Sequence, residues 1–192
     1  MPQLHQPMNI AVYSGSFNPL HIGHLAVMRH MTEEAGFDCV YLIVSPKNPL
    51  KDGISSDTGR ERFDAAVRAV KRYEGLHVLV DDIELNMPEP HYTIRTLDAL
   101  KKREPENTFT LIMGADNLSD IRRWRDYQRI LSEYGVAVFP RQGFDLTAIR
   151  YDLLKEDSSY KINILNAEMV DISSTIIRNA IASGEDVSQW LM

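Results

Sequence analysis

Cysteine is almost absent from this sequence. Cys39 is the single one among 192 residues, so no intramolecular disulfide can form, and neither can a zinc site built on several cysteines. Cys39 directly precedes the apolar run Val40–Val44. We therefore interpret it as a small buried hydrophobic residue rather than as a reactive thiol.

Long apolar runs and excess positive charge are also lacking. No run approaches the roughly 18 apolar residues of a membrane-spanning helix, and the opening residues MPQLHQP do not resemble a signal peptide. The formal net charge of -6 argues against a broad surface for nucleic acid or an anionic membrane. We expect a cytoplasmic protein without nucleic-acid or membrane partners. A small basic pocket remains compatible with this charge and is all that phosphate chemistry needs.

The composition is that of an ordinary globular domain. Hydrophobic residues make up 44% and charged residues 25% of the chain, and this length suits one domain with a full core. We see no repeat, low-complexity tract or linker. The expectation is a single domain over residues 1–192, with a flexible tail over residues 1–8.

Continuous apolar runs alternate with helical patterns along the chain. The expected strands are Asn9–Tyr13, Val40–Val44, His77–Val80, Phe109–Met113, Gly135–Phe139 and Ile162–Leu165. The expected helices are Ile22–Ala35, Gly59–Tyr73, Thr93–Lys102, Asp116–Leu131, Leu146–Lys155 and Ser173–Ser183. This order predicts an α/β fold, a single doubly wound, Rossmann-like parallel sheet covered on both faces. Ligands of such sheets bind beyond the carboxyl ends of the strands.

The segment Ser14–His24, SGSFNPLHIGH, follows the first expected strand. Gly15 lets the backbone turn sharply, and N–H groups of the loop and helix start can face phosphate oxygens. His21 and His24 share one side of the first helical turn and can donate hydrogen bonds to a phosphate whose charge is growing. Gly23 between them leaves room for a bulky ligand. The alternative is a helix start with two histidines that bind a metal, for which no third ligand stands out.

The segment Ile172–Arg178, ISSTIIR, opens the last expected helix. Ser173, Ser174 and Thr175 are natural N-cap residues and neutral phosphate donors beside the positive end of a helix. Arg178 lies one turn further on and can reach the same anion. Taken alone, a capped helix with a surface arginine explains this segment equally well.

Both segments resemble the signatures of the HIGH-motif nucleotidyltransferases. The resemblance implies that the first segment binds the ATP phosphates and stabilises the transition state, through Gly15, Ser16, Phe17, His21 and His24. The more common threonine of that signature is Ser16 here, which keeps a hydroxyl. The second segment is implied to hold the β- and γ-phosphates through Ile172, Ser173, Ser174, Thr175 and Arg178.

Gly114 and Asp116 follow an expected strand, and Trp124 stands eight residues after Asp116. A carboxylate at a strand end can accept hydrogen bonds from ribose hydroxyls, and an indole one to two turns along a helix can stack on a flat ring. In isolation, Trp124 is better interpreted as a core residue. Together, however, these residues resemble the bacterial nicotinate-mononucleotide adenylyltransferases, in which Gly114 and Asp116 would contact ATP and Trp124 the pyridine ring.

Two further segments resemble the same family. Tyr92 and Thr93, in PHYTIRTL, would frame the nicotinate carboxylate, with His91 in place of the usual serine. Thr93 can equally be a helix cap, and both roles are compatible because a helix N-terminus suits a carboxylate. Arg141, in FPRQG, matches a strand-end arginine that would contact the ATP phosphates.

The segment SPKNPLK occupies the place of the family's substrate loop. Asn48 and Lys51 would bind the mononucleotide, Lys51 through its phosphate, although Leu50 replaces the histidine of the family's His-Lys pair. We interpret Arg60 and Arg62, on the following helix, as solvated charges or as helpers in anion binding.

The resemblance implies an adenylyltransferase of NAD biosynthesis that joins AMP from ATP to nicotinate mononucleotide. The 5′-phosphate attacks the α-phosphorus in line, and His21, His24 and Arg178 stabilise charge, with Mg²⁺ carried on the ATP phosphates and no metal held by the protein itself. Alternatives remain: transfer to nicotinamide mononucleotide, transfer to pantetheine phosphate, against which His21 and Trp124 argue, and a noncatalytic nucleotide sensor. The sequence does not indicate an oligomeric state.

Overall fold

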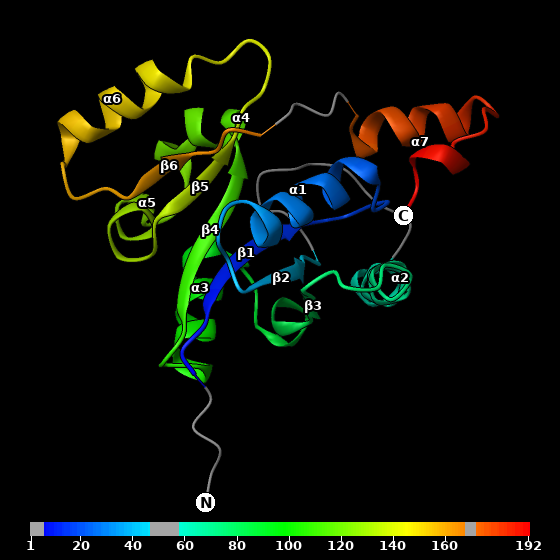
Figure 1. The fold of residues 1–192 in the computed structure, drawn as a ribbon, viewed down its shortest axis with the longest axis horizontal. Helices are drawn as coiled ribbons and strands as arrows, with labels where there is room; N and C mark the ends of the chain where they lie inside the picture. Colours follow the sequence, from blue (N-terminus) through cyan, green and yellow to red (C-terminus); the bar gives the residue numbers. More distant parts are fainter. Residues whose placement is uncertain (1–5, 47–57, 168–171) are drawn as a thin grey trace, which may run out of the picture.

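A parallel β-sheet forms the centre of the molecule (Figure 1). The computed structural model describes residues 6–46, 58–167 and 172–192. Six strands pair in the order β3-β2-β1-β4-β5-β6, and every pairing is parallel. The strands are β1 (Asn9–Gly15), β2 (Cys39–Val44), β3 (Val78–Asp81), β4 (Thr108–Gly114), β5 (Val136–Phe139) and β6 (Ile162–Ile164). The predicted doubly wound α/β fold is confirmed.

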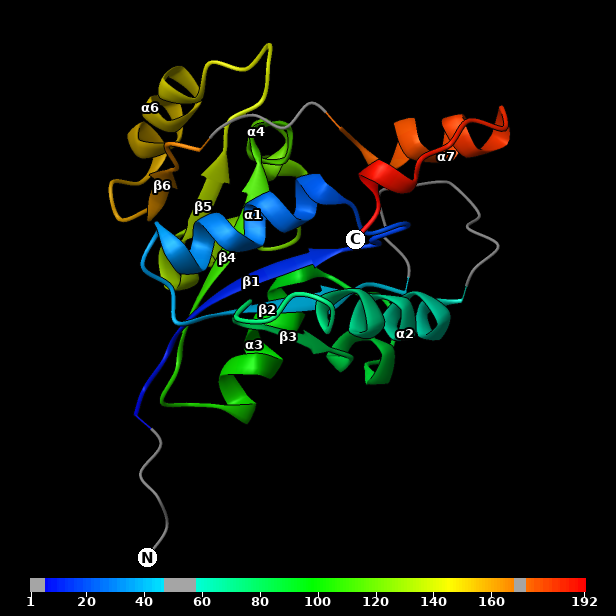
Figure 2. The same cartoon turned by 45° about the vertical axis from the view of Figure 1, so that its right-hand side comes forward.

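Helices cover both faces of the sheet, as Figure 2 shows. One apolar cluster joins the sheet to α1 and α2, and the other joins it to α3 and α6. The helices are α1 (Ile22–Glu33), α2 (Gly59–Val70), α3 (Thr93–Arg103), α4 (Ala115–Ser119), α5 (Tyr127–Arg129), α6 (Leu146–Glu156) and α7 (Ser174–Ala182). Within the described ranges, no helix is long and apolar enough to cross a bilayer.

The strands are continuously apolar because both of their sides are buried. In β1, Ile10 and Val12 belong to one cluster, whereas Ala11 between them belongs to the other. Successive side chains of a strand point to opposite faces, so a strand covered twice needs apolar residues at every position. This is the physical reason why the apolar runs located the strands correctly.

The direction of winding reverses between β1 and β4. From β1 the chain proceeds to β2 and β3 on one side, and from β4 to β5 and β6 on the other. The carboxyl ends of β1 and β4 are Gly15 and Gly114. The loops after these two strands therefore diverge at the switch point, where open α/β sheets bind their ligands.

The stretch Asp116–Leu131, predicted to be mainly helical, is mainly helical but does not form one continuous helix. The chain instead forms α4, a 3₁₀ turn at Ile121–Arg123, α5 and a π-helical turn at Ile130–Tyr134. Asp126 separates them in the left-handed region at φ 50, which aspartate tolerates better than most residues. The broken path still buries its apolar residues, since Ile121 and Leu131 are both fully enclosed.

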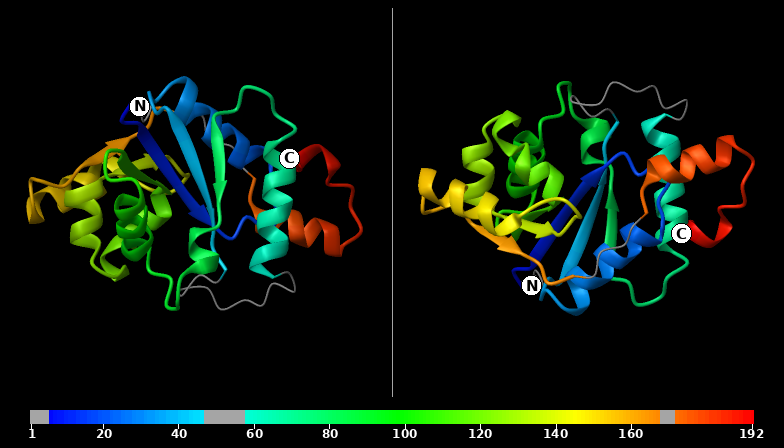
Figure 3. Two further views of the ribbon diagram at one scale, coloured as in Figure 1. Left: turned by 90° about the horizontal axis from the view of Figure 1, so that it is seen from below. Right: turned by 90° about the horizontal axis from the view of Figure 1, so that it is seen from above.

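The C-terminal segment returns to the loop that precedes α1. Helix α7 lies at the opposite end of the molecule from α6, as Figures 1 and 3 show. Leu191 then forms an isolated antiparallel bridge with His21. Met192 is buried, and its N–H donates to the Leu20 carbonyl at 3.5 Å. The loop after β1 is thus packed against elements that are remote in sequence.

Candidate active site

Two of the predicted site residues form an ion pair at the carboxyl edge of the sheet. Arg141, which follows β5, places its Nε 3.1 Å from Oδ1 of Asp116 on α4. A Cβ on Gly114 would lie 2.5 Å from that oxygen and 2.9 Å from that nitrogen. Gly114 is therefore required for the pair to lie directly over the end of β4. The Arg141 side chain is exposed and that of Asp116 partly so, so the pair adds little stability and leaves the Arg141 charge accessible to a ligand.

His21 and His24 form a reciprocal cap at the start of α1. The His21 Nδ1 accepts from the Gly23 N–H at 3.2 Å, and the His24 Nδ1 accepts from the His21 N–H at 3.2 Å. The two imidazole rings stack with centroids 3.7 Å apart. A ring nitrogen that accepts a hydrogen bond carries no proton. Each neutral imidazole therefore has its proton on Nε2, and both histidines keep that N–H as a donor.

Burial keeps both histidines neutral. His21 is 4% exposed; burial, with a smaller effect of the Arg141 charge, lowers its pKa from 6.5 to about 4. Burial also lowers the pKa of His24 well below its usual range, and His21 and Arg141 act in the same direction. Near neutral pH the folded protein therefore carries both side chains as neutral imidazoles rather than as imidazolium cations.

The lowered His21 pKa predicts a loss of stability in acid. Between pH 6.5 and 4 the unfolded chain binds a proton that folded His21 does not bind, so the free energy of unfolding falls as pH falls through this window, by up to about 3 kcal/mol. Asparagine at this position can cap the helix but does not titrate. Urea unfolding at several pH values should show a clearly shallower loss in His21→Asn. Parallel curves for both proteins would contradict the assignment.

Phe17 shapes the loop after β1 from the inside. Its backbone lies in the left-handed region at φ 45, and its side chain is 6% exposed. The ring meets His24 edge-on at 5.1 Å and Tyr13 at 5.2 Å between centroids. A Cβ on Gly15 would lie 3.1 Å from this ring. Because the side chain of Phe17 packs inward, its backbone is the part that can face a ligand.

The two sequence motifs meet in space. Ser173 caps α7 by accepting from the Ile176 N–H at 3.3 Å. On the loop before α1, the Pro19 carbonyl accepts from the Ser174 hydroxyl at 3.1 Å, and the Asn18 carbonyl accepts from Arg178 Nη1 at 2.7 Å. A second Arg178 nitrogen donates to the Thr175 hydroxyl at 3.0 Å. In these contacts the Ser173 and Thr175 hydroxyls act as acceptors and keep their O–H donors, whereas the Ser174 donor is used by Pro19.

The space beside Gly23 is not open, which corrects the expectation of room for a bulky ligand. A Cβ on Gly23 would lie 3.0 Å from Cγ2 of Ile172 and 3.0 Å from Cε1 of His21. The missing side chain thus lets Ile172, at the start of the second motif, approach the helix that carries the histidines. Gly23 serves contact between the two motifs.

The residues assigned to the acceptor lie against the α3 and α6 side of the sheet. Tyr92 and Trp124 both pack, half-buried, against the same apolar cluster. Tyr92 is the N-cap of α3, so the interpretation of Thr93 as the cap is wrong. Trp124 follows a 3₁₀ turn in extended backbone rather than lying on a helix. Asn48 and Lys51 lie outside the described residues.

His91 departs from the usual small residue and is buried. It is 9% exposed, and no hydrogen-bond partner reaches its Nδ1 from the described part of the chain. It directly precedes the N-cap of α3. The larger imidazole is therefore accommodated inside the fold next to the proposed carboxylate site.

Arg62 and Glu84 were missed or misinterpreted at the level of sequence. Arg62 is 6% exposed rather than solvated, a correction that its spacing from Ala66 on the inner face of α2 could have suggested. Glu84 is 2% exposed and accepts from the hydroxyls of Thr96 at 2.7 Å and Ser14 at 3.4 Å. No motif marks Glu84, which lies in the 3₁₀ turn Ile83–Asn86 that follows β3.

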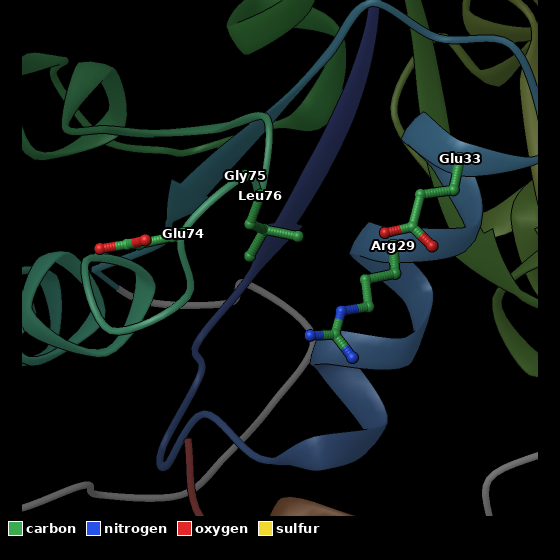
Figure 4. A pocket seen from close by; sticks show the side chains of 5 residues that line it. All are labelled: Arg29, Glu33, Glu74, Gly75 and Leu76. Carbon is green, nitrogen blue, oxygen red and sulfur yellow. The ribbon is translucent and has the colours of Figure 1, made fainter.

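Other features do not belong to this site. A pocket of about 190 Å³ is lined by Arg29 and Glu33 of α1 and by the turn Glu74–Leu76, whose side chains are drawn in Figure 4. No motif residue lines it, and Arg29 lies over the Tyr73 ring at 5.9 Å. Among residues 6–46, 58–167 and 172–192, no three histidine, cysteine or acidic side chains cluster as metal ligands.

A doubly wound sheet whose switch point carries the HIGH-type histidine pair, with the second motif beside it, defines a nucleotidyltransferase. Consistently, residues 12–180 match the model of the cytidylyltransferase-like family. A Flavobacterium johnsoniae protein named probable nicotinate-nucleotide adenylyltransferase is 38% identical over 184 residues, covering 96% of this chain and 92% of its own. A Bacteroides fragilis protein of the same name is 37% identical, with coverages of 94% and 85%. The chain belongs to the nicotinate-nucleotide adenylyltransferase family.

Solved structures agree with the fold. The Plasmodium falciparum nicotinic acid mononucleotide adenylyltransferase complexed with NaAD superposes with a TM-score of 0.79 at 18% identity, covering 96% of this chain and 90% of that one. The same enzyme complexed with APC gives a TM-score of 0.74 at 17% identity, with the same coverages. At this identity the likeness concerns the arrangement of the elements alone.

Proposed function

We propose that the protein transfers the adenylyl group of ATP to the 5′-phosphate of nicotinate mononucleotide, releasing pyrophosphate and forming nicotinate adenine dinucleotide. The observation that carries this proposal is the pair of neutral Nε2–H donors of His21 and His24 beside the start of α7. Relatives named for this activity support the choice of acceptor.

The reaction needs no nucleophile from the protein. A 5′-phosphate oxygen of the mononucleotide forms a bond to the α-phosphorus, and the bond from that phosphorus to the β-phosphate bridging oxygen breaks. Pyrophosphate leaves with the electron pair. The two Nε2–H groups, with the N-terminus of α1 behind them, stabilise the negative charge that gathers on the transferring phosphoryl oxygens.

The leaving pyrophosphate is assigned to the start of α7. A guanidinium has five N–H donors, and Arg178 uses Nη1 for Asn18 and Nη2 for Thr175. The remaining donors can hold the β- and γ-phosphates together with the hydroxyls of Ser173 and Thr175, whereas the Ser174 hydroxyl would first have to release the Pro19 carbonyl, to which it donates. We assign Gly114, Asp116 and Arg141 to ATP as well. The divalent cation is assigned as Mg²⁺ bound to ATP, where it shields the phosphate charge.

The acceptor is assigned to the α3 side of the switch point. The first turn of α3, from Thr93 onward, offers backbone N–H groups and a positive helix end to the nicotinate carboxylate, whereas the Tyr92 N–H donates to the Pro90 carbonyl at 3.1 Å. Trp124 would stack on the pyridine ring, and Asn48 and Lys51 would bind the mononucleotide, Lys51 through its phosphate. The charged carboxylate of nicotinate is attracted to the positive end of a helix, whereas the neutral amide of nicotinamide is not. The site therefore favours nicotinate mononucleotide over nicotinamide mononucleotide.

Pyrophosphate release with different acceptors tests the proposal. We expect kcat/KM for nicotinate mononucleotide to exceed that for nicotinamide mononucleotide by about 10- to 100-fold, because one charge-assisted interaction distinguishes them. Pantetheine phosphate should give no turnover. A preference for pantetheine phosphate, or ATP binding without turnover on any acceptor, would refute the proposal, the second result in favour of a nucleotide sensor.

A further inference from the structure

One buried side chain ties together the two loops that follow β1 and β2. Arg62, on α2, donates from Nη1 to the Ser16 carbonyl at 2.6 Å and to the Ser45 carbonyl at 2.9 Å. Its Nη2 donates to the Pro46 carbonyl at 3.0 Å. The Ser45 N–H also donates to the Gly15 carbonyl at 2.9 Å, which continues the pairing of the two strands. A single guanidinium therefore links the loops that follow the neighbouring strands β1 and β2.

The base from which Arg62 extends is itself fixed. Thr58 and Glu61 form a capping box at the start of α2, with bonds of 3.2 Å and 2.7 Å. A Cβ on Gly59 would lie 3.2 Å from the Cα of Pro46. The first turn of α2 is thus pressed against the segment whose carbonyl Arg62 holds, and Arg62 leaves the helix one turn later.

Holding the Ser16 carbonyl also orients the next amide. In a trans peptide the C=O and the following N–H point in opposite directions, so a Ser16 oxygen held by Arg62 turns the Phe17 N–H away from α2. Phe17 has the positive φ of 45, a conformation that persists only where its surroundings enforce it. The loop carrying this strained residue is the one assigned to the ATP phosphates.

We propose that Arg62 is a positioning residue for adenylyl transfer, which sets the Ser16–Phe17 peptide and the Ser45–Pro46 segment relative to each other. This rests on the proposed function of the Ser16 loop. Burying a charge is costly unless hydrogen bonds compensate it, and three hydrogen bonds of Arg62 go to backbone carbonyls that lead directly into the site. Lysine keeps the charge but has a compact ammonium, which cannot reproduce a planar fork across three carbonyls.

The experiment compares Arg62→Lys, Arg62→Ala and, as a control, Arg68→Ala, an exposed arginine of the same helix. Steady-state kinetics are measured well below the melting temperature, with the folded fraction set by circular dichroism. We expect kcat per folded molecule to fall about 10-fold in R62K and about 100-fold in R62A, with a weaker Kd for a nonhydrolysable ATP analogue. R68A should behave as wild type.

Chemical rescue supplies the readout that a purely structural role would not change. A cavity of about 230 Å³ is lined by Arg62 and by the loop residues Phe17–Leu20, so a small cation has a path to the vacated position. Methylguanidinium at millimolar concentration should raise kcat of R62A saturably and leave R62K unchanged.

The outcomes are separable. Folded R62K and R62A with kcat and ATP-analogue affinity within twofold of wild type overturn the inference, and so does the failure of both variants to fold, which assigns Arg62 to stability alone. Absence of rescue in folded R62A also counts against it. If wild type releases no pyrophosphate, the proposed function fails, whereas the ATP-analogue Kd of the variants still decides whether Arg62 orders the loop.

Discussion

Replacing His24 with alanine should lower kcat by about 10²- to 10³-fold and change the Kd of nicotinate mononucleotide by less than about threefold. In the proposed mechanism the Nε2–H of His24 would donate to charge that exists only while the phosphoryl group is in transfer, so its loss would affect the transition state more than the ground state. Single-turnover rates and mononucleotide titrations measure the two quantities separately. Near-normal turnover would refute the catalytic assignment.

His24 also has a structural role, which the matched variants separate. Its Nδ1 accepts from the His21 N–H, so alanine removes half of the capping box as well as the donor. Asparagine places its amide oxygen near the Nδ1 position and lacks a group at Nε2, whereas the glutamine amide reaches the Nε2 position. His24→Asn should therefore retain stability but show the alanine kcat, and His24→Gln should recover part of the rate. Equal activity in H24N and wild type would mean that capping is the whole role.

The strands of the sheet were predictable because each one is marked by the residues within its own segment. Each strand is covered on both faces, so its apolar run is unbroken and visible in the sequence without any knowledge of neighbours. The stretch from Asp116 to Leu131 was not predictable in the same way. Helical and 3₁₀ turns bury residues at similar spacings, and whether a helix continues at Asp126 depends on the core that Ile121 and Leu131 must both reach.

The motifs were predictable for a different reason. The residues that hold the motif loops in place were not predictable. A histidine pair or a run of hydroxyls is a chemical pattern within a few residues. Arg62, by contrast, is held by the carbonyls of Ser16, Ser45 and Pro46. Every residue has a carbonyl, so such a partner leaves no trace in residue type. The same holds for the contact between Gly23 and Ile172, which exists only once two remote segments meet.

Replacing Arg178 with alanine should affect pyrophosphate more than any other ligand. The reverse reaction, in which pyrophosphate and nicotinate adenine dinucleotide regenerate ATP and the mononucleotide, isolates this effect because pyrophosphate consists of the two phosphates assigned to Arg178. We expect the KM for pyrophosphate to rise about 10- to 100-fold, as for the loss of a charge-assisted hydrogen bond. The KM for the dinucleotide should change little. Initial rates of ATP formation at varied pyrophosphate provide the measurement.

Arg178 also donates a hydrogen bond to the Asn18 carbonyl. A change in R178A could therefore come from loosening of the loop before α1 rather than from loss of phosphate binding. Ser174→Ala supplies the comparison, because the Ser174 hydroxyl makes the neighbouring contact to Pro19 without carrying charge. If Arg178 only holds the loop, R178A and S174A should show similar losses in kcat, and the KM values for pyrophosphate and for the dinucleotide should change equally. Phosphate binding predicts that the pyrophosphate KM rises selectively in R178A and that Arg178→Lys, which retains the charge, recovers part of it. An unchanged pyrophosphate KM in R178A would remove Arg178 from the phosphate site and leave it as a link between the two motifs.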